Sequence, residues 1–218
     1  AIDYYTRCLK IKEQTGDKRS AAGALNNIGN VYLIQGDYDK ALEYQTRGLK
    51  IQNEIGDKLG SSLTLSNLGV ISKNKGDTSA SLSYYEQSLA IENELGDLFG
   101  ASSSLNNIGL IYYYRGQIPE AEKYFNQSLE IGEKIQDKQG IAISLSNMGL
   151  IHKQKGDYNK AIDFHQSALK LSLEMGDVIS IRDGSRSLYD IYKLQRNFAE
   201  ALKMYELYIS YKDSILSE

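Results

Sequence analysis

Residues 25–32 read Leu-Asn-Asn-Ile-Gly-Asn-Val-Tyr, and variants of this stretch return at intervals of forty residues. Leucine opens each copy and glycine lies four residues later, at Leu25 and Gly29, Leu65 and Gly69, Leu105 and Gly109, and Leu145 and Gly149. A fixed period of this size indicates stacked supersecondary units, none of which can bury its apolar face alone. The repeat therefore decides the fold class.

Each block of forty residues is predicted to hold two helices. In residues 18–57, the apolar residues of the quoted stretch have helical spacing and define one buried stripe. Gly36-Asp37 then interrupts the pattern, because glycine suits a left-handed residue after a helix and aspartate suits the N-cap of the next one. A second helix follows from Ala41 to Ile51, and Gly56-Asp57 repeats the same signal. Each repeat is therefore predicted to be two antiparallel helices joined by short turns.

Small residues recur where the two helices of a pair must approach each other. A glycine in the middle of a helix costs about 0.8–1 kcal/mol relative to alanine. Close helix crossing would explain why glycines stand in one column at Gly29, Gly69, Gly109 and Gly149. Other small residues form two more columns, at Ala41, Ser81, Ala121, Ala161 and Ala201, and at Cys8, Gly48, Ser88, Ser128 and Ala168.

These columns resemble the tetratricopeptide repeat along the whole chain. The resemblance is carried by Leu-x-x-Ile-Gly-x-x-Tyr at residues 25–32, then Gly-Asp-Tyr, then Ala-Leu-x-Tyr at residues 41–44. The longer repeat of forty residues is similar to arrays in kinesin light chains, spindle-orientation adaptors and bacterial peptide-sensing regulators. The resemblance implies an all-α, right-handed superhelical solenoid of antiparallel helix pairs, whose concave groove captures an extended or helical peptide.

We expect residues 1–218 to form a single array. Residues 1–17 would be the second helix of a truncated repeat, and residues 178–218 an atypical C-terminal repeat. Full repeats are expected at residues 18–57, 58–97, 98–137 and 138–177. Because the chain starts without Met and inside a repeat, we expect it to be a piece of a longer protein.

The last repeat departs from the pattern, with Tyr189 in place of the glycine and Arg196-Asn197 in place of Gly-Asp. Its sequence from Leu188 to Leu216 resembles the closing repeat of tetratricopeptide sensor modules in Bacteroidetes-type signalling proteins. The resemblance implies an output domain beyond this chain, such as a histidine kinase.

Asparagines are the first candidates for a peptide-binding site. The exposed side of the first helix is expected to carry Asn26, Asn27 and Asn30, and Asn106 repeats Asn26. The Asn27 column continues at Asn67, Asn107 and Asn147. A carboxamide donates and accepts hydrogen bonds, so such a ladder could pair with the backbone of any extended peptide. Two alternatives stay open: the amides could bond to the adjacent repeat, or common descent of the repeats could preserve them.

Aromatic and basic residues are the second group of candidates. Tyr113 and Tyr114 could supply an aromatic pocket in the groove, whereas Tyr112 belongs to the buried stripe. Lys153 and Arg186 could attract acidic groups of a peptide, although Asp183 and Asp190 partly offset their charge. Scattered charges on a helical face are more often simply solvated.

Composition disfavours several functions. A net charge of −3 argues against nucleic acid and against anionic membrane surfaces as partners of this module. The two histidines, His152 and His165, fall in columns of tyrosine and phenylalanine, and Cys8 falls in a column of small residues. No phosphate-binding, dinucleotide or metal motif is present. We therefore expect no catalysis, no cofactor and no metal in this chain.

The sequence thus predicts a module that binds a protein or peptide, as the sensory or scaffolding part of a bacterial signalling protein. The alternative is a structural spacer, or a homodimer formed through the apolar side of residues 1–15. The compartment stays open between the cytoplasm and the periplasm-facing part of a membrane-anchored protein.

Overall fold

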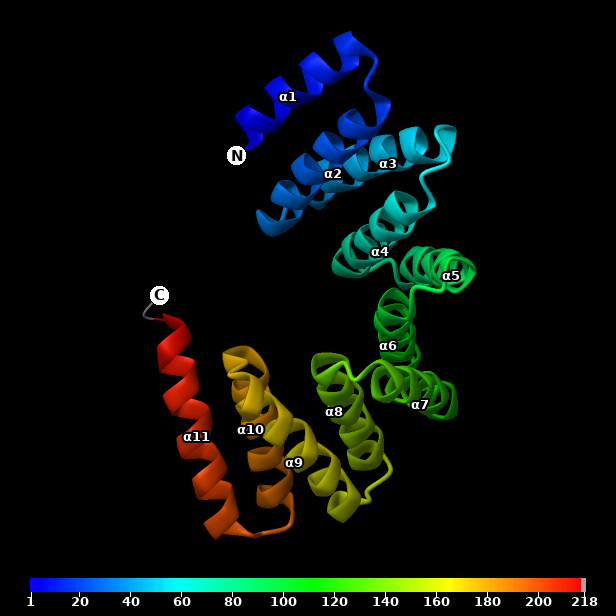
Figure 1. Cartoon of the computed structure of the whole chain (residues 1–218). Helices are drawn as coiled ribbons and strands as arrows, with labels where there is room; N and C mark the ends of the chain where they lie inside the picture. Colours follow the sequence, from blue (N-terminus) through cyan, green and yellow to red (C-terminus); the bar gives the residue numbers. More distant parts are fainter. Residues whose placement is uncertain (217–218) are drawn as a thin grey trace. The chain divides into compact units, whose positions relative to one another are not determined.

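A computed structural model describes residues 1–216 of the chain and the side chains of residues 1–212, and every regular element in this part is an α-helix (Figure 1). The helices are α1 (Ile2–Thr15), α2 (Lys18–Ile34), α3 (Tyr38–Glu54), α4 (Lys58–Asn74), α5 (Thr78–Leu95), α6 (Leu98–Tyr114), α7 (Ile118–Ile135), α8 (Lys138–Gln154), α9 (Tyr158–Met175), α10 (Val178–Leu194) and α11 (Phe198–Leu216). None of the helices in this part has both the length and the hydropathy that a membrane span requires.

Aspartate begins most of the helices, as the sequence predicts. The side chain of Asp17 accepts a hydrogen bond from the backbone N–H of Ser20 at 3.1 Å, and Asp57 accepts one from Gly60 at 3.2 Å. Such a bond satisfies one of the backbone donors that the first turn of a helix leaves free. The same cap recurs at α3, α5, α6, α8, α9 and α10, at Asp37, Asp77, Asp97, Asp137, Asp157 and Asp177.

Left-handed residues end the helices at intervals of twenty residues. Glycine takes the positive φ at Gly16, Gly36, Gly56, Gly76, Gly96, Gly116, Gly156 and Gly176. The same conformation is adopted by Gln136, with φ 56°, and by Arg196, with φ 59°. A left-handed backbone costs a residue with a β-carbon roughly 1–2 kcal/mol. Tertiary packing on both sides of these two turns therefore holds them in a conformation that their own side chains disfavour.

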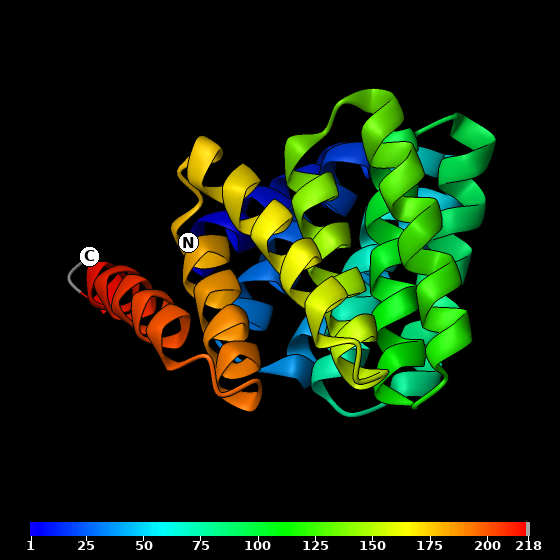
Figure 2. The same cartoon turned by 90° about the horizontal axis from the view of Figure 1, so that it is seen from below.

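The described chain divides into two compact units, residues 1–104 and the residues from Leu105 onward. In the first unit α2 packs on α3 and α4 on α5, and in the second α8 packs on α9 and α10 on α11. Both views show α11, in red, against α10, in orange (Figures 1 and 2). The core of the first unit contains Leu9, Leu25 and Ile28. The second unit has two clusters, one around Phe125 and Ile151 and one around Leu188 and Ile191.

The glycine column has the steric cause that the sequence suggests. A β-carbon at Gly69 would lie 2.7 Å from the Tyr85 ring, and one at Gly109 would lie 2.5 Å from the Phe125 ring. At Gly149 it would lie 2.6 Å from the His165 ring. These three glycines therefore make room for a ring on the second helix of the pair, and Gly29 makes room for the Gln45 side chain, which would lie 2.9 Å from its β-carbon.

His165 is fully buried in this arrangement, and neither of its ring nitrogens has a hydrogen-bond partner among the described residues. Burial lowers the pKa of His165 to about 4, with a smaller contribution from the charge of Lys153. The ring is thus neutral in the folded protein near neutral pH. The histidine is a packing residue, as its column predicts.

This burial predicts a loss of stability in mild acid. The unfolded chain takes up the proton near pH 6.5, whereas the folded chain takes it up near pH 4. Between these values the unfolded state binds more protons, so the free energy of unfolding falls as the pH is lowered from 6.5 to 4. The full loss is about 3 kcal/mol. Urea denaturation of wild type and His165→Phe across this range should show that the variant lacks this loss.

Phenylalanine is the matched replacement because Phe125 occupies the same position over Gly109. Tyr85→Phe, two repeats before His165 in the same column, is the control and should retain the acid dependence of the wild type. If His165→Phe lost as much stability as the wild type over the same range, burial of this imidazole would not be the cause.

Candidate functional site

The asparagines of the predicted ladder differ in exposure along the column. Asn27 is exposed, Asn67 and Asn107 are half-buried, and Asn147 is only 7 % exposed. The side chains of Asn27, Asn67 and Asn107 make no hydrogen bond within the part of the chain that the structure describes. Their carboxamides therefore keep donors and acceptors for a ligand.

The neighbouring amides of the first unit are engaged in packing. Asn26 Nδ2 donates to Thr64 Oγ1 at 2.6 Å, which joins α2 to α4 across consecutive repeats. Thr64 Oγ1 in turn donates to Gln52 Oε1 at 2.9 Å. Asn30 Oδ1 accepts a bond of 2.7 Å from Gln45 Nε2 within the same helix pair. Of these predicted contact residues, Asn26 and Asn30 thus have a structural partner already.

Hydroxyls take the place of these amides one repeat further along. Ser66 Oγ lies 2.9 Å from Ser88 Oγ, and Ser88 Oγ lies 2.8 Å from Glu92 Oε1. Glu92 is buried, and burial raises the pKa of its carboxyl, while the hydroxyls of Ser104 and Ser88 partly offset this rise. A polar seam therefore runs through the first unit between its helix pairs.

The second unit contains a matching seam centred on Asn106. Its Nδ2 donates to Ser128 Oγ at 2.7 Å and to Ser144 Oγ at 3.0 Å. Asn147 Nδ2 donates to Asn106 Oδ1 at 3.1 Å. In this unit Asn106 and Asn147 bond to side chains of an adjacent repeat, which is the alternative that the sequence left open. Of the predicted ladder, only Asn27, Asn67 and Asn107 have side chains without a protein partner among the described residues, and these three remain candidates for contact with a peptide.

The aromatic and basic candidates lie in the second unit. Tyr113 and Tyr114 form an edge-to-face pair with ring centroids 5.4 Å apart. Tyr114 is 73 % exposed, whereas burial raises the pKa of Tyr113. Arg186 packs over the Tyr208 ring, with its guanidinium carbon 5.3 Å from the ring centroid. Lys153 is half-buried near His165.

Pairing with carboxylates reduces the free positive charge on α10. Arg186 Nε lies 3.5 Å from Asp190 Oδ2, and Arg182 Nε lies 2.7 Å from Asp183 Oδ1. Of the candidate basic residues, Arg186 is thus offset by Asp190, whereas Asp183 pairs with Arg182. A strongly basic clamp is not formed by these residues.

Exposed apolar side chains beside the asparagines were missed by the sequence analysis. In the first unit Leu59, Leu63 and Phe99 are 53 %, 60 % and 60 % exposed. Leu63 and Leu59 lie four and eight residues before Asn67, and therefore on the same side of α4. Ile143 and Ile179 are exposed at the corresponding helices of the second unit. Their signal was the presence of large apolar residues in two columns outside the buried stripe, one with Leu59, Phe99 and Ile179 and one with Leu63 and Ile143.

Groups that could catalyse a reaction are not gathered in the described residues. His165 is buried, and His152 stacks on Phe164 with ring centroids 5.1 Å apart. Cys8 is half-buried. Among these residues no three His, Cys, Asp or Glu side chains come together as metal ligands would.

Paired helices, glycine crossings and capped turns at regular intervals define a helical repeat protein of the class that binds other proteins or peptides. The family model for the tetratricopeptide repeat matches residues 1–54, 20–94 and 100–174. The chain belongs to the tetratricopeptide repeat family. As the resemblance implies, the fold is the all-helical tetratricopeptide type, and the chain is a protein-interaction module. This fold is generally non-catalytic. Among curated proteins, none matches the sequence of this chain.

Solved structures share the fold at low sequence identity. BtubC (BKLC) from P. vanneervenii is 18 % identical with a TM-score of 0.84, over 100 % of this chain and 91 % of that chain. A Podosopora anserina protein described as a kinesin light chain, with nearly identical TPR-like repeats, is 15 % identical with a TM-score of 0.68, over 90 % and 97 %. Aspartyl phosphate phosphatase F from Bacillus subtilis is 16 % identical with a TM-score of 0.80, over 95 % and 55 %. These likenesses establish the fold.

Because Asn106 packs between repeats and Asn107 has no side-chain partner among the described residues, substitutions at these two adjacent residues should affect stability differently. Asn106→Ala should lower the free energy of unfolding by about 1–3 kcal/mol, because it leaves buried hydroxyls and the Asn147 amide without their partner. Asn107→Ala should change it by less than about 0.5 kcal/mol. Urea denaturation measures both. Equal losses for the two variants would contradict the separation of packing amides from free ones.

Proposed function

We propose that the exposed side of the first helices binds an extended peptide segment of a partner protein. In the first unit, the carboxamides of Asn27 and Asn67 would pair with the peptide backbone. Leu59, Leu63 and Phe99 would take up its apolar side chains. The observation that supports this most is the presence of amides without a protein partner beside large exposed apolar residues.

The expected binding free energies differ between the asparagine amides and the apolar side chains. Each backbone hydrogen bond contributes about 0.5–1.5 kcal/mol net, so two amides give about 1–3 kcal/mol. This is too little for useful affinity once the ordering of the peptide is subtracted. Fully burying a Leu or Phe side chain contributes about 1.5–3 kcal/mol. The apolar residues would therefore supply most of the affinity and the amides would fix the direction of the peptide.

The second unit offers a different surface for the same purpose. Asn107 is the free amide there, Tyr114 is the most exposed ring and Lys153 and Arg186 are basic. A peptide on this unit would place an aromatic or apolar side chain near Tyr113 and Tyr114. Acidic side chains would fit better near Lys153, which has no carboxylate partner among the described residues, than near Arg186, which already pairs with Asp190.

We place this module in a bacterial signalling protein, as its sensory or scaffolding part. The support is the similarity of residues 188–216 to the closing repeat of Bacteroidetes-type sensor modules. Peptide binding would then be passed to an output domain such as a histidine kinase. The module would lie in the cytoplasm or, in a membrane-anchored protein, on the periplasmic side.

A spacer or homodimer is the alternative function, and one observation favours it. Tyr4 and Ile11 are 70 % and 58 % exposed on α1. Two copies could bury these side chains against each other. Light scattering of wild type and Tyr4→Ser/Ile11→Ser distinguishes this alternative, because it predicts dimers that the double substitution dissociates.

Selection of binders from a displayed library of random peptides tests the proposed face. The selected peptides should bind the wild type, and Asn27→Ala/Asn67→Ala should weaken binding about tenfold, as expected for a loss of about 1.4 kcal/mol. Fluorescence polarisation gives the Kd. Thr46→Ala/Gln87→Ala, on exposed positions of α3 and α5, is the matched control and should leave the Kd unchanged.

Thermal denaturation must first show that the variants are as stable as the wild type. Equal affinity of wild type and Asn27→Ala/Asn67→Ala would move recognition to another face. Failure to select any peptide would favour the spacer or dimer.

A further inference from the structure

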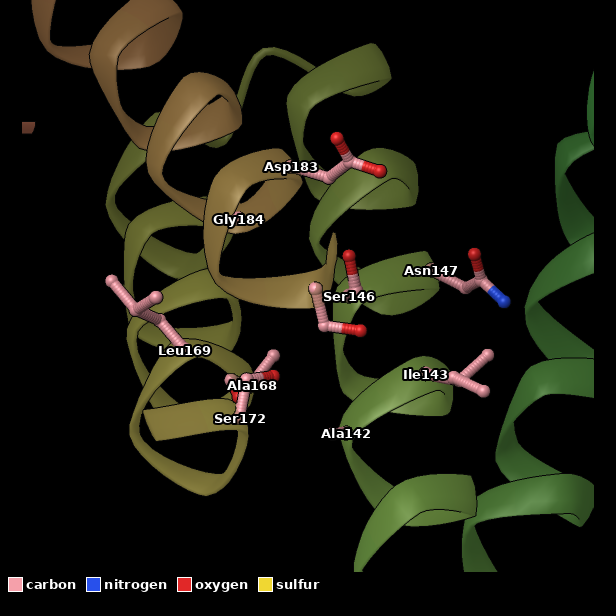
Figure 3. Close-up of a pocket in the computed structure, with 10 residues that line it drawn as sticks. Ala142, Ile143, Ser146, Asn147, Ala168, Leu169, Ser172, Asp183 and Gly184 are labelled. Atoms are coloured by element: carbon pink, nitrogen blue, oxygen red, sulfur yellow. Dashed lines mark hydrogen bonds between the residues drawn. The ribbon is translucent and has the colours of Figure 1, made fainter. Parts of the chain in front are cut away.

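A pocket of about 160 Å³ lies between α8, α9 and α10 in the second unit (Figure 3). It arises where the polar seam is interrupted. Asn26 reaches Thr64 and Asn106 reaches Ser144, in each case thirty-eight residues further along. The next pair in this series is Ser146 and Gly184, which are too short to meet. The asparagine that spans the gap at the Asn26 and Asn106 junctions is therefore missing here.

The size of the pocket limits what can enter. Its volume is close to the roughly 150 Å³ cavity that holds one benzene molecule. It can therefore admit one side chain of a partner but not a folded segment. Ala142, Ala168, Leu169 and Gly184 supply an apolar lining suited to a stem of methylene groups.

The polar lining is rich in hydrogen-bond acceptors. The buried Ser172 hydroxyl donates to the Ala168 carbonyl oxygen at 3.0 Å, and the Ser180 hydroxyl donates to Asp177 Oδ2 at 2.6 Å. Because a hydroxyl has one proton, both oxygens are left as acceptors toward the pocket. The Ser146 hydroxyl has no protein partner within the described residues and can accept as well.

A carboxylate stands at the rim. Asp183 uses Oδ1 to accept from Arg182 Nε at 2.7 Å, and its side chain is 62 % exposed. Its second oxygen, Oδ2, has no hydrogen-bond partner among the described residues. Figure 3 shows Asp183 of α10 on one side of the pocket and Ala168 and Ser172 of α9 on the other. Asn147 is directed away from α9 and α10 in this view, consistent with its bond to Asn106.

We infer that this pocket binds a primary amine on a short aliphatic stem, as a lysine side chain of a partner presents. An ammonium has three donors and no acceptor, so it matches a lining in which the Ser172 and Ser180 hydroxyls have already donated their protons and the Ser146 oxygen can accept as well. Asp183 supplies the opposite charge, which it shares with Arg182. The inference rests on the proposed function in one respect: the amine is taken to belong to a bound peptide.

Three acetylated and amidated pentapeptides test the inference, each with alanine at every position except the centre. The central residue is lysine, norleucine or acetyllysine, so stem length is kept while the charge is removed. Chemical shifts of the backbone amides of Ser146, Asp183 and Gly184 report binding to the full chain. The lysine peptide should give saturable shifts and bind at least fivefold more tightly than the other two.

Two substitutions locate the effect. Gly184→Thr restores the residue found at Thr64, and its β-carbon would lie 3.7 Å from Leu169 Cδ1, an ordinary contact, so the fold should tolerate it. It should reduce binding of the lysine peptide at least tenfold by filling the pocket. Asp183→Asn should reduce it at least fivefold. Asp190→Asn, which removes a carboxylate of the same helix away from the pocket, should change it less than twofold.

Equal binding of the lysine and norleucine peptides would overturn the preference for an amine. Shifts that persist in Gly184→Thr would place binding elsewhere, and absence of saturable shifts with all three peptides would overturn the pocket as a site. The peptide selection described above uses variants within residues 1–104, whereas this pocket lies in residues 142–184, so the two proposals fail separately.

Discussion

The close approach of two helices over a glycine is the constraint on which the rest of the structure depends. At Gly109 a β-carbon would collide with the Phe125 ring, and the same is true of Gly69 over Tyr85 and of Gly149 over His165. The contact fixes the separation of each helix pair. It also explains why a ring that is basic in water can be accommodated at His165: the position is selected for shape, and burial keeps the imidazole neutral.

Close packing of the pairs forces polar side chains together between repeats, and this divides the asparagines into two groups. Asn26 and Asn106 join consecutive first helices by bonding to the hydroxyls of Thr64 and Ser144. Asn67 and Asn107 lie next to this seam and remain without a protein partner. One set of amides thus holds the repeats in register, and the adjacent set is available to a ligand. Where the seam is interrupted at Gly184, a pocket takes its place.

Much of the fold could be predicted from the sequence because its signals are local. Gly-Asp pairs mark the helix ends through backbone conformation and capping, and these were confirmed, for example at Gly36 and Asp37. Less of the candidate site could be predicted from the sequence. Asn26 and Asn27 are adjacent in sequence, and a rotation of about 100° around the helix decides which one packs. Their partners lie in the next repeat, so no pattern within one repeat reveals them. The positive φ of Gln136 was equally hidden, since that residue type disfavours it.

The most direct test of this account is the hydrogen exchange of the asparagine side-chain amides, measured by NMR. The account predicts that the Nδ2 protons of Asn106 and Asn147 are protected, because both nitrogens donate within the buried seam. Those of Asn27, Asn67 and Asn107 should exchange at the rate of a solvated amide. Equally slow exchange at Asn67 and Asn107 would contradict the account, because it would mean that these amides also serve the packing of the repeats.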